Sequence, residues 1–581
     1  MLASAGVAAG ETGKDSRVTI GGESGALTQA LVGLREVLAG LVLGLDVPGA
    51  PEAERLRNEL VGQIDDYLVP RLREMEAPLL MVVGGSTGAG KSTLVNSIVG
   101  RPVSPAGVLR PTTRAPVLVC HSGDLHWFED ERILPGLSRT TGGSAAPGGL
   151  QLVPTDALPA GIALLDSPDI DSVVTANREL AGQLLAAADS WLFVTTAARY
   201  ADAVPWDLLA AARERGTALS LVLNRVPGDA EAEVSAHLRE MLVERGLGAT
   251  ELLVVPEAAL DAGLIPPAAL APVRRWFDAL AADGQARSAL VRRTLAGALD
   301  SLPRRVALVE RAAEEQIAAA DVLRAAVEDA YRQGLAEVDE TVKSGSLLRG
   351  EVLARWHEVV GTGELMRSLE TRVGWVRDRV RAFLTGKPPA DAELTAAVET
   401  SVESVVHAAA DRSAERAGSS WREHLPGRAL LAGGERLDAA SPELAGKTGE
   451  EVRGWQRFVF ELVREEGADK RTTARVASLG VNGAGFTVML AVFVQTGGLT
   501  GAEIAIAGGT SALSQKVLEA IFGDQAVRSL ATQARNDLLG RVERLLAEEA
   551  GRFARLIDPR VPAPEDPVRV GDALRRVERA R

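Results

Sequence analysis

The chain has little cysteine, few aromatic residues and no excess of positive charge. Cys120 is the only cysteine among 581 residues, which excludes an internal disulfide and a cysteine-rich zinc site. Aromatic residues make up 4% of the chain, which favours helices packed through small side chains over an aromatic-rich β-sandwich. The formal net charge of −14 excludes a surface that binds nucleic acid throughout, and we expect no nucleic-acid partner. The N-terminal residues show no secretory-signal pattern, so we expect a cytoplasmic protein.

Changes in periodicity divide the N-terminal half into segments. Residues 1–25 are rich in Gly, Ala and Ser, and we expect them to be flexible. Residues 26–76 predict helices that join a stalk or neck. In residues 77–283 short apolar runs alternate with helical stretches, which predicts an α/β domain with a mostly parallel sheet and helices on both faces. The predicted helices are Thr28–Asp46 and Glu52–Glu76, the predicted strands are Leu79–Val83, Pro116–Cys120, Ile162–Leu165, Trp191–Thr195, Leu219–Leu223 and Leu252–Val255, and Pro135–Gly149 is predicted as an exposed loop.

The strand signal ends near residue 283, and long helical patterns follow. Residues 284–475 predict an all-α stalk, which we interpret as a helical bundle in preference to an isolated coiled coil. Its clearest helix is predicted over Pro303–Val342, with the proline in the first turn. Residues 524–560 predict a return helix of the stalk, and residues 561–581 an Arg-rich tail. A stripe near heptad spacing runs through Val306, Val309, Ala313, Ala320, Leu323, Val327 and Ala330.

A glycine-rich segment fits the pattern G-x-x-x-x-G-K-[ST] of a phosphate-binding loop, or P-loop. It follows a predicted strand and opens a predicted helix, which is the context that the pattern requires. The glycines let successive backbone N–H groups point at phosphate oxygens beside the positive end of a helix. Lys91 would reach the β- and γ-phosphates, and the hydroxyl of Ser92 would hold Mg²⁺. The predicted phosphate-binding residues are Gly85, Ser86, Thr87, Gly88, Ala89, Gly90, Lys91, Ser92 and Thr93.

Further polar residues stand at the ends of predicted strands. A threonine pair, Thr112 and Thr113, precedes a strand, and a threonine there can place its hydroxyl on Mg²⁺ and its carbonyl on the attacking water. Asp166 ends another strand, where a carboxylate linked to Mg²⁺ is expected. Asn224 ends a third strand and opens a loop that could read a base. Each feature alone is weak, and their order along the chain is what indicates a nucleotide site.

The segments GGSTGAGKST, RPTTRAP and LLDSPDIDS, followed by a long helical region with an apolar segment, resemble those of the bacterial dynamin-like large GTPases. The motif match covers about residues 79–230. The resemblance implies GTP or GDP and Mg²⁺ as ligands. It assigns catalytic roles to Lys91, Thr87, Thr113 and Asp166, and metal binding to Ser92, Thr113 and Asp166. Thr113 corresponds to the switch I threonine, with Thr112 as the alternative if the register shifts by one, and Asp166 to the switch II aspartate.

The chain also departs from the pattern of these GTPases. Asp169 stands where switch II usually carries a glycine whose N–H senses the γ-phosphate. Pro227 stands where the base-reading loop usually carries an aspartate, which weakens the prediction of a guanine preference. Thr87 and Gly88 replace a polar pair that helps to orient water, so we expect slow turnover. The remaining candidates for base binding are Asn224, Arg225 and Asp229.

Residues 476–523 contain a long uncharged segment. Its first arm, Val476–Thr496, is long enough to cross a bilayer as a helix, and a glycine-rich turn separates it from a shorter arm. Lys and Arg residues flank both ends, which predicts a hairpin that enters the membrane from a cationic, cytoplasmic side. Burial of this hairpin inside the stalk, or at an oligomer interface, is the alternative.

These features together predict a slow, dynamin-like GTPase that couples its cycle to self-association and membrane remodelling. The expected partners are a second copy, joined through the GTPase domain or the stalk, or a related chain in a hetero-oligomer, together with anionic membrane lipid. The protein would be peripheral to the inner face of the cell membrane or inserted there through the hairpin. Two alternatives stay open: a nucleotide-binding membrane scaffold with little or no hydrolysis, and a P-loop ATPase.

Overall fold

The computed structural model describes residues 15–105, 115–130, 133–134, 137–142, 149–168, 175–344, 390–434, 436–466 and 524–581. The chain divides into two compact units. The first unit comprises residues 1–43, 49–314 and 562–581, and the second comprises residues 44–48 and 315–561. The predicted apolar hairpin at 476–523 and the threonines at 112 and 113 lie outside the described residues.

The first unit is built on an eight-stranded sheet with the order β3-β4-β2-β5-β1-β6-β7-β8. All neighbouring pairs are parallel except β2 and β5, which confirms the prediction of a mostly parallel sheet. Each predicted strand is present. The strands are β1 (Leu79–Gly85), β2 (Val117–Cys120), β3 (Ser138–Thr141), β4 (Gly149–Pro154), β5 (Ile162–Asp166), β6 (Ser190–Thr196), β7 (Ala218–Val226) and β8 (Glu251–Pro256).

The prediction of a loop over Pro135–Gly149 was wrong, because β3 lies inside it. The four residues of β3, Ser-Arg-Thr-Thr, are exposed or half-buried, so no apolar pattern marks them. They form the edge of the sheet beside β4. An edge strand pairs through its backbone on one side only, and its side chains need not be apolar.

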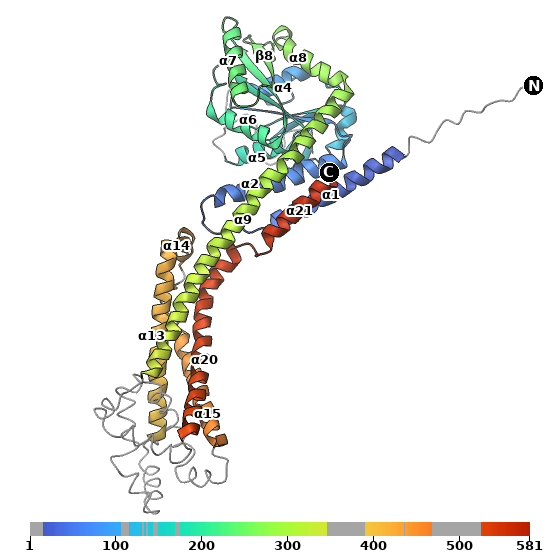
Figure 1. The fold of residues 1–581 in the computed structure, drawn as a ribbon. Helices are drawn as coiled ribbons and strands as arrows, with labels where there is room; N and C mark the ends of the chain where they lie inside the picture. Colours follow the sequence, from blue (N-terminus) through green and yellow to red (C-terminus); the bar gives the residue numbers. More distant parts are fainter. Residues whose placement is uncertain are drawn as a thin grey trace, which may run out of the picture. The chain divides into compact units, whose positions relative to one another are not determined.

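Helices cover both faces of the sheet, as predicted (Figure 1). Leu80 and Val82 of β1 pack on one face with α5 (Thr175–Ala186), α6 (Ala203–Arg215) and α7 (Glu231–Glu244). Leu79, Met81 and Val83 pack on the other face with α4 (Lys91–Val99) and α8 (Pro267–Ala282). Successive side chains of a strand point to opposite faces, so a strand buried on both sides is apolar throughout.

A third core of the first unit joins helices from both ends of the chain. It contains α1 (Asp15–Gly40), α2 (Ala50–Gln63), a π-helical turn (Ile64–Leu68), α3 (Val69–Arg73) and α21 (Asp566–Ala580), with the first part of α9 (Gly284–Lys343). The first helix begins at Asp15, ahead of the predicted Thr28. The Arg-rich tail contains α21, whose Val570, Ala573 and Val577 are buried in this core.

A buried ion pair fixes these N-terminal helices to the sheet. Arg71 of α3 pairs with Asp189, which lies directly before β6. The Asp189 carboxylate also accepts the N–H of Leu80 at 2.8 Å, and Arg71 donates to the carbonyl of Pro78 at 3.1 Å. Burial raises the pKa of Asp189, while Arg71 and the Leu80 N–H oppose the rise. Loss of either partner would leave the other charge buried without compensation.

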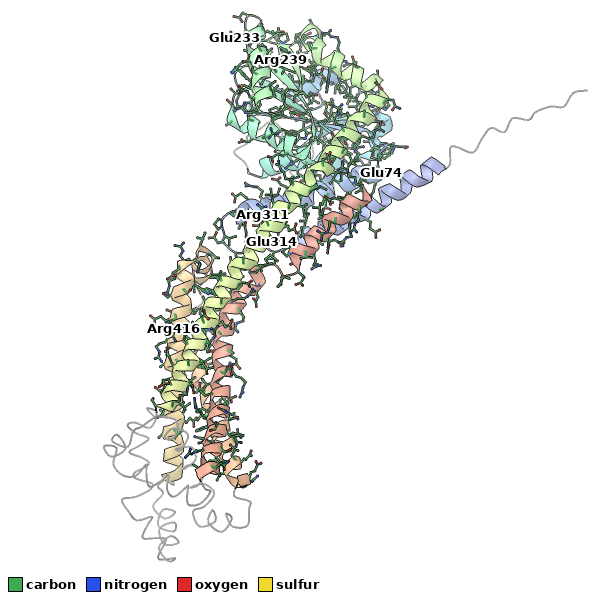
Figure 2. The ribbon with its side chains drawn as sticks, in the orientation of Figure 1. Glu74, Glu233, Arg239, Arg311, Glu314 and Arg416 are labelled. Atoms are coloured by element: carbon green, nitrogen blue, oxygen red, sulfur yellow. The ribbon has the colours of Figure 1, made fainter. Side chains whose placement is uncertain are left out.

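Long helices make up the second unit. They are the later part of α9, α13 (Ala390–Glu423), α14 (Leu425–Leu431), α15 (Leu444–Glu466) and α20 (Asp524–Ile557) (Figure 1). The predicted heptad stripe of α9 is buried, with each residue at most 5% exposed. Trp421 of α13 is fully buried and donates its indole N–H to the carbonyl of Leu323 at 3.0 Å. Arg416 of α13, labelled in Figure 2, pairs with Glu337 of α9 at 2.5 Å.

The prediction that Pro303 opens a helix was wrong. Pro303 lies inside α9, which already begins at Gly284. A proline inside a helix removes one backbone hydrogen bond and crowds the preceding turn. Its neighbours Leu302 and Val306 are fully buried, and their packing keeps the helix continuous through this position.

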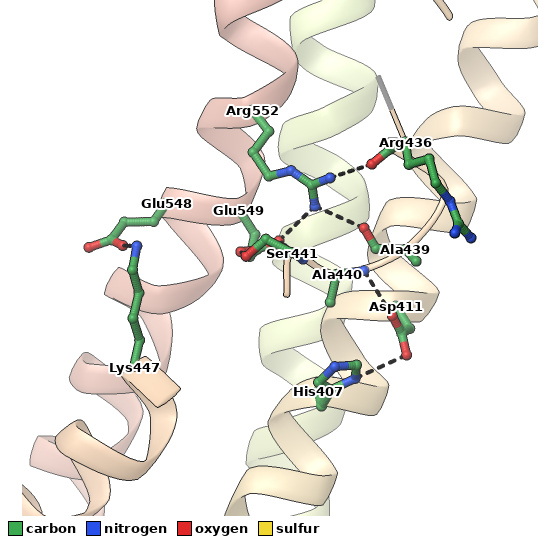
Figure 3. Close-up of polar contacts among 10 residues, drawn as sticks. All are labelled: His407, Asp411, Arg436, Ala439, Ala440, Ser441, Lys447, Glu548, Glu549 and Arg552. Atoms are coloured by element: carbon green, nitrogen blue, oxygen red, sulfur yellow. Dashed lines mark hydrogen bonds and ion pairs between the residues drawn. The ribbon is translucent and has the colours of Figure 1, made fainter. Parts of the chain in front are cut away.

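A polar cluster fastens the connection between α14 and α15 to α20 (Figure 3). Glu549 of α20 is 4% exposed, and its carboxylate accepts the N–H of Ser441 at 2.8 Å and a guanidinium N–H of Arg552 at 2.9 Å. Arg552 donates in turn to the carbonyl of Ala439 at 2.8 Å. The described residues of this connection belong to no helix or strand, so the cluster supplies hydrogen bonds that its backbone needs.

We predict that Glu549→Ala lowers the free energy of unfolding by about 3 kcal/mol, because Arg552 is left as a buried charge without its carboxylate. The neighbouring Glu548→Ala is the control, since Glu548 pairs with Lys447 at the surface, and it should leave stability unchanged. Urea unfolding of both variants measures the difference. Equal losses in the two variants would contradict the role given to Glu549.

Asp66, in the π-helical turn, makes the stability of the fold depend on pH. Burial raises the pKa of Asp66 to about 6 from 3.8, against a hydrogen bond from Gln183 of α5 and with repulsion from Asp65. The folded state therefore binds this proton more tightly than the unfolded chain does. Stability supported by the protonated carboxyl is present below pH 3.8 and is lost as the pH rises toward about 6.

We predict that Asp66→Asn raises the free energy of unfolding by about 1 kcal/mol at neutral pH and gives no gain at about pH 4, because the amide stays uncharged throughout. Asp65→Asn is the control, since Asp65 pairs with Arg35 at 2.9 Å and should gain nothing at either pH. Unfolding curves at both pH values are the measurement. An Asp66→Asn gain that is the same at both would rule out titration of this carboxyl.

Candidate functional site

The P-loop lies between β1 and α4, as the sequence predicted for a strand, loop and helix in register. At Gly85 a Cβ atom would lie 2.1 Å from the carbonyl oxygen of Val194 on β6. Gly90 has a φ of +95°, and a Cβ there would lie 2.6 Å from the side-chain nitrogen of Asn224. Glycine fits both positions best: at Gly85 the neighbouring backbone leaves no room for a Cβ, and at Gly90 the positive φ favours glycine and a Cβ would displace the Asn224 side chain.

Lys91 is the first residue of α4, and its side chain lies back over the loop. Its ammonium donates to the carbonyls of Gly85 at 2.8 Å and Ser86 at 3.2 Å, and the residue is 5% exposed. The positive charge is thus held at the mouth of the loop. Ser92 and Thr93 follow in the first turn of α4, where the N–H groups of a helix are open to an anion.

The base-reading candidates differ in their burial and in their contacts with the P-loop. Asn224 is 4% exposed and donates to the carbonyl of Ala89 at 2.8 Å, so β7 is tied directly to the loop. Arg225 is exposed and has a φ of +53°, and its N–H donates to the Asn224 side chain at 3.0 Å. Pro227 accepts the N–H of Ala230 in the turn that carries the exposed Asp229.

Asp166 lies at the end of β5, in register with Val83 of β1, and is fully buried. The hydroxyl of Ser104 donates to its carboxylate. Ser104 is held in place by Asn96 of α4, whose side chain accepts the Ser104 N–H at 2.9 Å and donates to the Ser104 carbonyl at 2.9 Å. Thr113 and Asp169 lie outside the described residues.

Sequence patterns did not indicate Ser104, Asn96 or Arg199 as parts of the site. Asn96 had one available signal, a polar residue within the apolar run of α4. Arg199 follows β6 and donates to the carbonyl of Thr87 at 2.8 Å. No motif marks Ser104 or Arg199, because each reaches the site through a contact with a residue far away in sequence, Asp166 for Ser104 and Thr87 for Arg199.

The residues present fit a nucleoside phosphate and a magnesium ion. Gly85 lets the loop turn tightly against β6 and Gly90 lets it approach Asn224, since a Cβ at either would clash there, and Lys91 adds a cation at the loop. The carboxylate of Asp166 and the hydroxyl of Ser92 are the hard oxygen donors that Mg²⁺ takes, and α4 packs against β5. Within the described part of the chain, His, Cys, Asp and Glu residues form no cluster typical of other metal sites.

The carboxyl ends of β1, β5, β6 and β7 meet at one edge of the sheet and carry the P-loop, Asp166, Arg199 and Asn224. This arrangement defines a P-loop nucleotide-binding domain. The dynamin family model matches residues 81–141, which confirms the resemblance to dynamin-like GTPases that the motifs indicated. The match spans β1, the P-loop, α4, β2 and β3.

Parts of the chain are also similar to individual proteins. The tRNA modification GTPase MnmE of Acidiphilium cryptum is 35% identical over 120 residues, which make up 18% of this chain and 27% of that protein. The crystal structure of a point variant of Aquifex aeolicus Era, bound to GDP and AlF4⁻, matches 30% of this chain and 50% of that chain, at 20% identity and a TM-score of 0.21. An oligomerised bacterial dynamin pair matches 95% of each chain at 11% identity and a TM-score of 0.37.

We predict that Gly90→Ala weakens nucleotide binding by about tenfold or more, because the added methyl group displaces Asn224 from the loop. Gly100→Ala is the matched control: Gly100 ends α4 with a φ of +78°, but no atom lies within 4 Å of its Cβ position. Both variants strain the backbone, and only Gly90→Ala disturbs the site. Fluorescent GDP titration compares them, and equal affinities would contradict this role of Gly90.

Proposed function

We propose that this protein binds and hydrolyses GTP with Mg²⁺ and couples the cycle to self-association and membrane remodelling. The single observation that carries the proposal is the P-loop closed over by Lys91, inside a segment that matches the dynamin family. The MnmE protein named above is a tRNA modification GTPase, and its similarity to part of this chain supports guanine as the base.

The residues divide the work of phosphoryl transfer. The loop amides and Lys91 would bind the phosphates and neutralise the charge that develops on the transferred group. Ser92, Asp166 and Thr113 would hold Mg²⁺, which supplies further charge neutralisation when bound. Thr113 would orient the attacking water. Asn224 and Arg225 would pack on the base, and Asp229 is the remaining carboxylate of the base-reading turn.

The departures at Gly88, Asp169 and Pro227 predict slow turnover. Pro227 has no side-chain carboxylate to accept guanine N–H groups, so guanine selectivity would depend on Asp229 or on backbone groups. This substitution is the observation that favours the second candidate, an ATP-using P-loop protein. The other candidate is a membrane scaffold that binds nucleotide with little hydrolysis, and Gly88, Asp169 and Pro227 together motivate it.

Membrane action and self-association rest on the dynamin resemblance and on the uncharged segment at 476–523. The proposed location is the cytoplasmic face of the membrane, with anionic lipid, a second copy or a related chain as partners. None of the helices that the structure describes is apolar over a length that would span a bilayer. The second unit would act as the stalk that carries nucleotide-dependent changes toward the lipid.

We predict that the purified protein releases phosphate from GTP faster than from ATP, and that anionic liposomes raise the GTP rate. Lys91→Ala should abolish turnover of both nucleotides, because it removes the cation that closes the loop. The measurement is phosphate release with each nucleotide, with and without liposomes, for both proteins.

The outcomes separate the candidate functions. Selective turnover of ATP would replace GTP by ATP in the proposal. Binding without turnover above the background of Lys91→Ala would support the scaffold and make Asp169 the residue to explain. Turnover that anionic liposomes leave unchanged, together with a single monomeric species in sedimentation with and without nucleotide, would refute membrane-coupled assembly.

A further inference from the structure

The carbonyl groups of the P-loop have side-chain hydrogen-bond donors. A loop that turns its N–H groups inward to bind an anion leaves its carbonyls on the outer side, where they need donors of their own. Here these donors come from α4, from the segment after β6 and from β7. Lys91 donates to Gly85 and Ser86, Arg199 donates to Thr87, and Asn224 donates to Ala89.

Lys91, the donor from α4, differs from Arg199 and Asn224 because it also serves the nucleotide. The ammonium of Lys91 is the group that reaches the phosphates of a bound nucleotide, so its bonds to the loop carbonyls are exchanged for bonds to phosphate. Arg199 and Asn224 stay in place. Asn224 holds the part of the loop next to α4, through Ala89, and Arg199 holds the part nearer β1, through Thr87. Gly88, with a φ of +75°, lies between these two parts of the loop.

Arg199 is itself fixed in position. Its Nε donates to the carboxylate of Asp202 at 2.8 Å, while its Nη1 donates to the carbonyl of Thr87 at 2.8 Å. Asp202 is the N-cap residue of α6, yet its side chain does not cap that helix. Aspartate is among the best capping residues. Here its carboxylate binds Arg199, and α6 lacks the side-chain cap that Asp202 could have provided.

We propose that Arg199 is a positioning residue that adapts the P-loop to the terminal phosphate of a triphosphate. The inference rests on the proposed nucleotide binding and deepens it. The amides at the start of α4 bind the inner phosphates. Thr87 stands where dynamin-like GTPases carry residues that orient the attacking water, so this part of the loop faces the outer phosphate. Arg199 keeps the Thr87 peptide oriented, while Asp202 balances its positive charge.

The test compares the affinities for GDP and for a non-hydrolysable GTP analogue, each with Mg²⁺, by calorimetric titration. Arg199→Ala should weaken the triphosphate about tenfold and GDP much less, because the charge-assisted hydrogen bond that orients the Thr87 peptide is lost. Arg199→Lys keeps the charge without the two-pronged geometry and should restore part of the loss. Melting curves of each variant check that the fold is retained.

Arg274→Ala is the matched control. Arg274 of α8 donates its Nη1 to the carbonyl of Ile98 at 2.7 Å and its Nε to Asp278 at 3.1 Å. It therefore has the same pair of contacts, but at the opposite end of α4 from the P-loop. Its loss should leave the ratio of triphosphate to diphosphate affinity unchanged.

Each result decides the question. Equal weakening of both nucleotides in Arg199→Ala, or an unchanged ratio, would overturn the inference and leave the proposed function standing. If the wild type binds adenine nucleotides in place of guanine nucleotides, the same ratio is measured with ADP and an ATP analogue, and only the base assignment fails. If the wild type binds no nucleotide, both the proposed function and the inference are refuted.

Discussion

The backbone of the P-loop is the constraint on which the site depends. Its N–H groups serve the anion only if its carbonyls find partners elsewhere, and those partners come from residues distant in the sequence. The side chain of Asn224 bonds to the carbonyl of Ala89, and that of Arg199 to the carbonyl of Thr87. The parallel strands β1, β6 and β7 make this possible, because they bring their carboxyl ends to one edge. The sheet thus shapes the loop as well as supporting it.

The opposite end of the same strands is tied to helices by the buried pair of Arg71 and Asp189. Asp189 precedes β6, whose carboxyl end leads to Arg199, and its carboxylate bonds to Leu80 at the start of β1, which leads to the P-loop. The strands between are fully buried. The buried pair therefore ties α3 to the two strands that lead to the phosphate-binding groups, inside the first unit.

The departures from the dynamin pattern can be compared with the contacts at the base end and at the phosphate end of the site. Pro227 removes a carboxylate from the base-reading turn, while Asn224 remains tied to the loop. Asp166 is buried and held by Ser104, which Asn96 anchors to α4. The departures therefore affect both ends of the site: Pro227 alters the base end, and Gly88 and Asp169 alter the phosphate end.

The sequence by itself determined the order of the chemical motifs along the chain: the P-loop, the apolar strands buried on both faces and the heptad stripe of α9 were all predicted from local pattern. Such patterns are short-range, since they depend on glycine conformations and on strand and helix periods. The exposed edge strand β3, the passage of α9 through Pro303, and the contacts of Ser104 and Arg199 were decided by tertiary structure. Each depends on a neighbour far away in sequence: β4 pairs with β3, buried packing holds the proline in helix, and β1 and β5 bring Thr87 and Asp166 to their donors.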